Sequence, residues 1–316
     1  MTYLLNNSEL CTLLKLSSSV PTPLSPLYGC SDMNNENYAV LERSGFIKTT
    51  DQGTVVDGVL MRILATLSSP DVCLKLERTS VSSDACLCSN DGNVWYVYSY
   101  IGYLDAHMIG EFSSPDEVCD WFFGEYAPDC IPSEGEAASG AFSLSYDEWN
   151  LFMLTQFIFM RKAHGNAEND DVLAFSELAS SKFGEFLQGE LVKRGFPVYA
   201  SLFESLSDED FLKELCESLY QKDIFDVHEN GGDENDGGDI AENGDVYIGY
   251  TDAARDILDC RGLLECIKIS RSDINGTAYK TLISSRKNGY TVLADDGHDI
   301  RVVAVKSIPF KTYLKV

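Results

Sequence analysis

Residues 72–78 read Val-Cys-Leu-Lys-Leu-Glu-Arg, and residues 265–271 read Glu-Cys-Ile-Lys-Ile-Ser-Arg. At one fixed offset the cysteine, the lysine and the arginine coincide, and leucine stands against isoleucine twice. Apolar residues at every second position are typical of a β-strand with one buried face. We interpret the two stretches as equivalent strands of an internal duplication. The alternative is that one short strand pattern recurs by chance.

The sequence around the two stretches also repeats in the same order. Residues 5–10 match residues 144–149, and residues 41–47 match residues 219–225. The duplication predicts an α+β fold with two quasi-symmetric halves that share a mainly antiparallel central sheet. A helical bundle is inserted in the second half.

Local patterns fill in the elements of this fold. Asn7-Ser8-Glu9 precedes leucines at helical spacing, so residues 3–16 predict a capped amphipathic helix. Beyond Pro70 the apolar period changes to two, and Asp91-Gly92 predicts a tight hairpin turn. The predicted organisation is a first α+β half (1–127), a linker (128–142), a helical bundle (143–228), an acidic flexible loop (229–244) and a second antiparallel meander (245–316).

The chain is acidic and has the composition of a globular protein. Of its 316 residues 44% are hydrophobic and 23% are charged, and the formal net charge is -26. This charge repels nucleic-acid phosphates and anionic lipid headgroups, so we expect neither as a partner. The most apolar stretch, residues 149–160, is shorter than the roughly 20 residues that span a bilayer, so we expect no membrane insertion. The first residues lack the pattern of a signal peptide, which predicts a cytoplasmic protein.

The ten cysteines predict reduced thiols that pack as small apolar groups. No CxxC pair occurs, and none of the four histidines stands at zinc-ligand spacing from a cysteine pair. Residues 233–244 resemble a calcium loop, but Gly237 and Gly244 stand where the fifth and the last ligand belong. We therefore interpret residues 229–244 as a solvated loop, and we expect no metal ion and no cofactor.

Catalytic motifs are missing from the sequence. The chain has no GxSxG elbow, no GxxxxGK[ST] loop, no GxGxxG and no HExxH. A winged-helix DNA reader would need basic residues on its recognition helix, and residues 57–67 offer only Arg62. We therefore predict no catalytic residues, and a protein that binds a partner rather than one that catalyses a reaction.

Three short runs resemble the first half of the EspG family, the cytosolic chaperones of type VII secretion in Gram-positive bacteria. The runs are residues 41–47, 53–57 and 67–71, which combine a leucine-to-glycine helix end, a glycine-to-aspartate turn and a Leu-Ser-Ser-Pro-Asp helix stop. The resemblance extends loosely over the whole chain, because that family also has two quasi-symmetric halves that share a central sheet. The chain departs from the mycobacterial pattern in its acidity, its cysteines and its acidic loop.

The resemblance implies a non-enzymatic chaperone or adaptor that binds a small, secreted helical-hairpin protein. Family members bind through a sheet loop and the helical bundle, which correspond here to residues 79–84 and 144–194. The candidate partner-binding residues in these segments are Thr79, Val81, Asp84, Phe152, Phe157, Phe159, Phe183 and Phe186.

The residues leave one alternative open, an enzyme of unrecognised class with an acidic cleft between the two halves. The identity of the partner and the oligomeric state also stay open.

Overall fold

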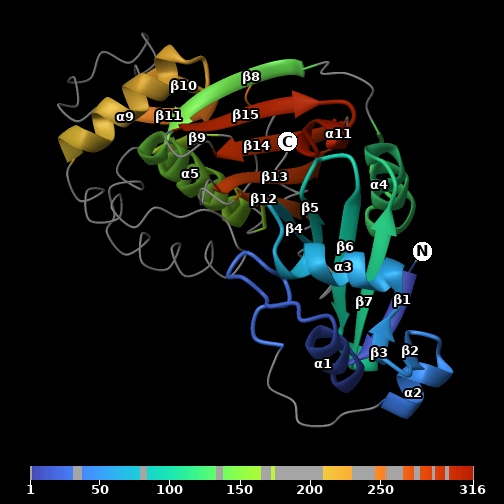
Figure 1. Ribbon diagram of the computed structural model, residues 1–316. Helices are drawn as coiled ribbons and strands as arrows, with labels where there is room; N and C mark the ends of the chain where they lie inside the picture. The colour runs from blue at the N-terminus through green and yellow to red at the C-terminus, as the bar shows by residue number, and fades with distance from the viewer. Residues whose placement is uncertain are drawn as a thin grey trace, which may run out of the picture. The chain divides into compact units, whose positions relative to one another are not determined.

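The computed structural model describes residues 2–30, 38–78, 84–132, 138–164, 172–174, 209–229, 246–252, 254, 266–273, 278–286, 289–295 and 299–315 (Figure 1). The chain divides into two compact units. Unit 1 comprises Met1–Ala137, Glu265–Ile283 and Lys306–Val316, and unit 2 comprises Ala138–Leu264 and Ser284–Val305. Several helices and a large, mainly antiparallel sheet confirm the predicted α+β class.

Most strands of the large sheet belong to unit 1. They are β1 (Thr2–Asn6), β4 (Val72–Arg78), β5 (Ala85–Ser89), β6 (Trp95–Ile101), β7 (Ala106–Phe112), β12 (Cys266–Asp273) and β13 (Ala278–Arg286). Their order is β1-β7-β6-β5-β4-β12-β13. Two further strands, β2 (Ile47–Thr50) and β3 (Gly53–Val56), form a separate hairpin.

The helices of unit 1 are short. They are α1 (Asn7–Leu16), α2 (Tyr38–Arg43), α3 (Gly58–Ser68), the 3-10 turn η1 (Gly102–Leu104), α4 (Pro115–Trp121), the π-helical turn η2 (Phe122–Tyr126) and α11 (Phe310–Tyr313). Figure 1 shows α3 lying across strands β5, β6 and β7, which it contacts. Leu60, Ile63, Leu64 and Leu67 of α3 are fully buried in a core that also contains Leu10 of α1. This apolar stripe is what fixes α3 on the sheet.

The prediction of a helix over residues 3–16 is wrong for its first part. Residues 2–6 form strand β1, which pairs with β7, and only residues 7–16 are helical. Tyr3 and Leu5 are buried while the residues beside them are exposed, so the segment follows the two-residue period of a strand.

Strands β4 and β12, which contain the repeated sequence, are neighbours and run antiparallel. The sequence match equates Leu76 with Ile269, and the register pairs these same two residues. Lys75 lies opposite Ser270, and Lys268, the equivalent of Lys75, lies opposite Glu77. This is the register that a local two-fold axis through the Leu76–Ile269 pair produces. The geometry of the pair therefore agrees with a duplication.

Several elements of unit 2 follow one another in the same order as elements of unit 1. Its elements are β8 (Ala138–Ser145), α5 (Tyr146–His164), β9 (Val172–Ala174), α9 (Glu209–Gln221), β10 (Phe225–Glu229), β11 (Val246–Tyr250), β14 (Gly289–Asp295) and β15 (Asp299–Val305). Strand β8 pairs with β15 as β1 pairs with β7, and β10 pairs with β11 as β2 pairs with β3. Residues 138–142 of the predicted linker belong to β8. Residues 175–208 of the predicted bundle and residues 230–244 of the predicted acidic loop lie outside the described residues.

The starts of α1 and α5 carry the same capping box. The Asn6 side chain accepts a hydrogen bond from the backbone N–H of Glu9 at 2.9 Å, and the Glu9 carboxylate accepts one from the N–H of Asn6 at 2.9 Å. In α5, Ser145 and Glu148 make the two equivalent bonds at 3.3 and 2.7 Å. Each box satisfies two backbone N–H groups that a helix start leaves unpaired.

The ends of α2 and α9 also correspond. In α2 the N–H of Phe46 donates to the carbonyl of Leu41 at 2.9 Å, and Gly45 has a φ of +76°. In α9 the N–H of Ile224 donates to the carbonyl of Leu219 at 3.0 Å, and Asp223 has a φ of +59°. Both are Schellman motifs, which place one residue in the left-handed region. The sequence match of residues 41–47 with 219–225 therefore reflects a shared backbone geometry.

Candidate partner-binding surface

Few of the predicted contact residues can be placed. Thr79, Val81, Phe183 and Phe186 lie outside the described residues, as do the side chains of Phe157 and Phe159 on α5. Phe152 is 1% exposed, and its ring contacts the rings of Trp149 and Tyr250, so it belongs to the interior of unit 2. Asp84 is exposed at the start of β5. The binding role of the eight residues stays a prediction.

Asp84 borders a hollow in unit 1 of about 510 Å³. The sheet forms one wall, and the loop that follows α1 forms the other. The lining residues are Pro23–Pro26, Cys73, Lys75, Asp84, Cys86, Tyr98, Tyr100, Ser270 and Ser272. The sequence analysis missed all of these except Asp84, although Tyr96, Tyr98 and Tyr100 alternate along β6 and therefore share one face of the sheet.

Tyr98 is held by a buried histidine. Its hydroxyl donates to Nδ1 of His107 at 3.1 Å, and Nε2 of His107 donates to Oδ1 of Asn7 at 2.5 Å. This arrangement corresponds to a neutral imidazole with its proton on Nε2. His107 is 4% exposed, and burial lowers its pKa, while the nearby Asp105 opposes the shift. Two hydrogen bonds therefore connect β6, β7 and α1 and hold the Tyr98 ring through a histidine whose lowered pKa favours the uncharged form.

Tyr100 is also held in place by a hydrogen bond of its hydroxyl group. Its hydroxyl donates to the Asp105 carboxylate at 2.7 Å, and Asp105 ends η1 with a φ of +48°. The tyrosine is 42% exposed, and Tyr103 in η1 is 88% exposed. Because both hydroxyls of Tyr98 and Tyr100 are already hydrogen-bonded, what the two residues offer a ligand is the surface of their rings.

The mouth of the hollow carries more negative than positive charge. Nζ of Lys75 lies 2.5 Å from the Glu77 carboxylate and 3.7 Å from the Asp84 carboxylate. A hydrogen bond to Glu77 is the largest of several causes that raise the pKa of Lys75, so the lysine stays charged. Two carboxylates therefore face one cation.

Thiols line the floor of the hollow. A hydrogen bond with Cys73 and burial both raise the pKa of Cys86, so its thiol stays protonated. A protonated thiol is a poor nucleophile and a poor metal ligand. Within the described ranges, no group of three or more His, Cys, Asp or Glu side chains is placed to hold a metal ion.

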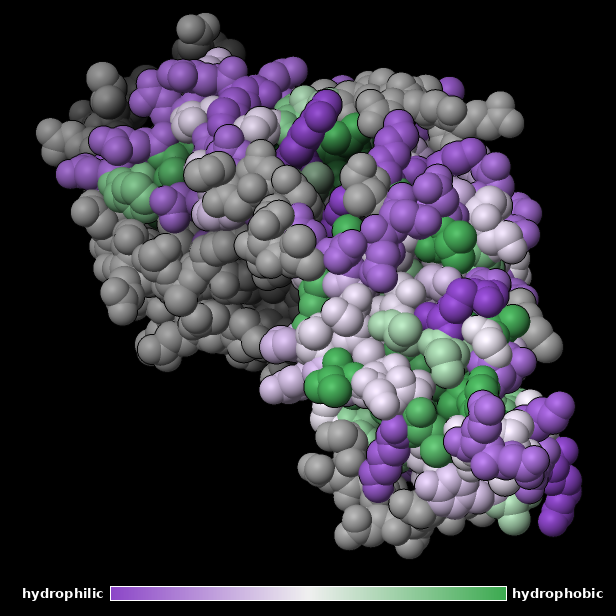
Figure 2. Space-filling view, in the orientation of Figure 1, coloured by the Kyte–Doolittle hydropathy of each residue, from purple (hydrophilic) through white to green (hydrophobic). Residues whose placement is uncertain are grey.

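Figure 2 shows how hydrophobic side chains are distributed on one face of the molecule. On the part that carries α3, small groups of hydrophobic residues alternate with hydrophilic ones. The exposed apolar residues of unit 1 include Leu4, Val20, Tyr28, Val55, Tyr100, Tyr103 and Leu104. Scattered exposure of this kind is normal for a folded protein and does not by itself mark a binding surface. A second concave surface of unit 1, of about 720 Å³, is lined by Phe123, Phe310, Asp116, Asp120, Lys311 and Lys315, among others.

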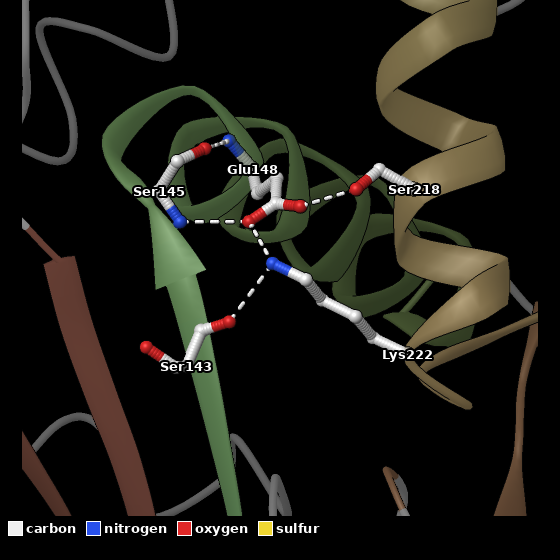
Figure 3. Close-up of polar contacts among 5 residues, drawn as sticks. All are labelled: Ser143, Ser145, Glu148, Ser218 and Lys222. Carbon is white, nitrogen blue, oxygen red and sulfur yellow. Dashed lines mark hydrogen bonds and ion pairs between the residues drawn. The ribbon is translucent and has the colours of Figure 1, made fainter.

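A second polar cluster lies in unit 2, around the capping box of α5 (Figure 3). The Glu148 carboxylate is 5% exposed and accepts hydrogen bonds from Nζ of Lys222 at 2.6 Å, Oγ of Ser218 at 2.6 Å and the N–H of Ser145 at 2.7 Å. Lys222 also donates to the carbonyl of Ser143 at 3.0 Å. The cluster joins α5, α9 and β8, and Figure 3 shows the ammonium group between the carboxylate and the strand.

The charge of Glu148 is stabilised where it lies. Burial raises its pKa, but the hydrogen bonds from Lys222, Ser218 and Ser145 and the charge of Lys222 outweigh burial and lower it overall. Every carboxylate oxygen has a donor, as a buried charge requires. We interpret the cluster as a structural clamp that joins α5, α9 and β8.

Comparisons with known proteins find matches among solved structures. No family model matches the chain, and no curated protein matches its sequence. Among solved structures, the chain is similar to a complex described as the Mycobacterium tuberculosis type VII secretion system chaperone EspG5 with the PE25-PPE41 dimer. The match has 10% sequence identity and a TM-score of 0.47, and it covers 99% of this chain and 93% of that one. In the part of the chain that the structure describes, no helix has the length and apolarity needed to cross a membrane.

Proposed function

We propose that this chain is a non-enzymatic chaperone or adaptor of the cytosol that binds a small, secreted helical protein destined for type VII secretion. The proposal starts from the resemblance of residues 41–71 to the EspG family. It is supported by the repeat of strand order, capping boxes and Schellman motifs between the two units.

The observation that carries the proposal is the hollow beside Asp84. The resemblance assigned residues 79–84 to partner binding, and the one residue of that segment that can be placed borders a concave surface. Its tyrosines are held by hydrogen bonds before any partner arrives. Rigid aromatic side chains lose little conformational entropy on binding and are frequent among the residues that dominate protein interfaces.

The test is capture of the partner from native cytosol with the purified, tagged chain. The variant Tyr100→Ala/Asp84→Asn removes the ring and the charge at the hollow. Its control, Tyr38→Ala/Asp51→Asn, makes the same two changes at exposed residues of α2 and of the β2–β3 turn. We expect wild type and control to retain one stoichiometric helical protein, identified by mass spectrometry, and the hollow variant to lose it.

Two results would contradict the proposal. One is that wild type retains no stoichiometric protein under any growth condition. The other is that the hollow variant, with wild-type circular dichroism and melting temperature, retains the partner as well as the control does.

A further inference from the structure

We infer that the hollow in unit 1 is a receptor for a basic side chain of the partner, and for arginine above all. The inference rests on the proposed function, because it names the chemistry that a partner presents to the same site. The hollow, of about 510 Å³, is large enough for one long side chain together with part of its backbone.

Tyr98 and Tyr100 give the hollow an aromatic wall. Tyr98 donates its hydroxyl proton to His107, and Tyr100 donates its proton to Asp105. Neither hydroxyl needs a ligand, so the ring surfaces are what the two residues offer. A ring carries negative charge on its face and attracts a cation within about 6 Å, and guanidinium groups stack on such rings most often.

The charged side chains at the mouth of the hollow favour a cation. Lys75 lies 2.5 Å from Glu77 and 3.7 Å from Asp84, so its charge is balanced by carboxylates already in place. Asp84 is 56% exposed, and its distance to Lys75 leaves room for a second donor. Glu77 and Asp84 thus outnumber the cation by two to one, in a chain whose formal charge is -26. A basic side chain is attracted both locally and over distance.

The hollow offers no unoccupied positive charge to an anion among its lining residues. Among its lining residues Lys75 is the one cation, and Glu77 and Asp84 occupy it. The remaining polar side chains, Ser25, Ser270 and Ser272, are neutral. An acidic side chain would have to displace an existing ion pair and would then be repelled by the Glu77 and Asp84 carboxylates.

The test uses small probes, so that it does not depend on knowing the partner. N-acetyl-arginine-N-methylamide is titrated into the full chain labelled with ¹³C in its tyrosine rings, and the signals of Tyr98 and Tyr100 are assigned with Tyr→Phe variants. The citrulline analogue has nearly the same shape without the charge. We expect saturable shifts of both tyrosines with the arginine probe and at least tenfold weaker binding of the citrulline probe.

Matched variants locate the contacts. Asp84→Asn should weaken the arginine probe about two- to fivefold, the range of a solvent-exposed ion pair. Tyr100→Leu should weaken it by a similar factor. Asp51→Asn, which removes an equally exposed carboxylate in the β2–β3 turn, should leave the affinity unchanged.

Equal binding of the two probes, shifts that do not saturate, or tighter binding of N-acetyl-glutamate-N-methylamide would overturn the inference. If the arginine probe does not bind but partner capture depends on Tyr100, the inference fails and the proposed function stands. If the probe binds as expected but no partner is captured, the hollow is a basic-group receptor and the proposed function fails.

Discussion

The buried clamp of unit 2 makes a quantitative prediction about stability. Lys222→Met removes the ammonium group that faces Glu148 and leaves the carboxylate, which is 5% exposed, with only Ser218 and the N–H of Ser145 as donors. Removing one partner of a fully buried pair costs about 3–5 kcal/mol. Because Lys222 is 37% exposed, water screens part of that interaction, and we expect a loss of about 1.5–3 kcal/mol.

A double-mutant cycle separates the pair from its surroundings. Lys222→Met, Glu148→Gln and the double variant are unfolded in urea and followed by circular dichroism. The coupling energy should be about 1–2 kcal/mol, with the double variant more stable than the sum of the single losses. The lowered pKa of Glu148 adds a second signature. Its stabilising contribution is present above the unfolded-state pKa of glutamate and declines as pH falls through the lower pKa of the folded state, so the wild type should lose its advantage over Glu148→Gln at acidic pH.

The exposed pair of Lys311 and Asp116 serves as the control. Its nitrogen–oxygen distance is 2.5 Å, but its side chains are 58% and 74% exposed. Lys311→Met should therefore destabilise the chain much less than Lys222→Met does. The reasoning is refuted if Lys222→Met costs no more than Lys311→Met, or if the cycle gives a coupling energy of zero.

Three further predictions follow from the described residues. Burial lowers the pKa of His107, so the free energy of unfolding, measured from pH 7.5 to 5, should decrease once the pH is below the unfolded-state pKa of histidine. His107→Gln should reduce this pH dependence, and an unchanged dependence would refute the prediction. Gly45→Ala should destabilise by about 1 kcal/mol and Asp223→Gly should stabilise by several tenths, because both positions are left-handed and only glycine is unstrained there; urea midpoints that move in the opposite directions would contradict the shared motif. Burial raises the pKa of the Cys216 thiol to about 12 and that of Cys119 to about 11, so iodoacetamide at pH 8 should label both slowly until urea unfolds the chain, and rapid labelling of native Cys216 by mass spectrometry would count against its burial.

The duplication could be predicted because the matching residues have roles that the backbone geometry fixes. Glu9 and Glu148 close capping boxes, and Gly45 and Asp223 take left-handed conformations, so each match between the two units has a local cause. The repeated strand was visible because its alternation survives in both copies, whereas the pairing of Leu76 with Ile269 was seen only in the structure.

The site could be predicted only in part, because it is assembled from distant segments. Asp84 was identified through the family resemblance, whereas the loop Pro23–Pro26 and Ser270 meet it only in the folded sheet. Phe152 was selected for its aromatic character, and it proved to be interior since Trp149 and Tyr250 cover it. Strand β1 was missed for a related reason, since its pairing with β7 is a tertiary contact that local helical spacing does not reveal.

The central claim is that the chain acts as a chaperone, and co-expression of the captured partner tests it most directly. The measurement is the soluble fraction of the partner when it is produced alone, with the wild-type chain, with Tyr100→Ala/Asp84→Asn, and with the control Tyr38→Ala/Asp51→Asn. The account predicts a partner that aggregates alone, is soluble as a stoichiometric complex with wild type and control, and is mostly insoluble with the hollow variant. A partner that is equally soluble in the absence of the chain would contradict the account.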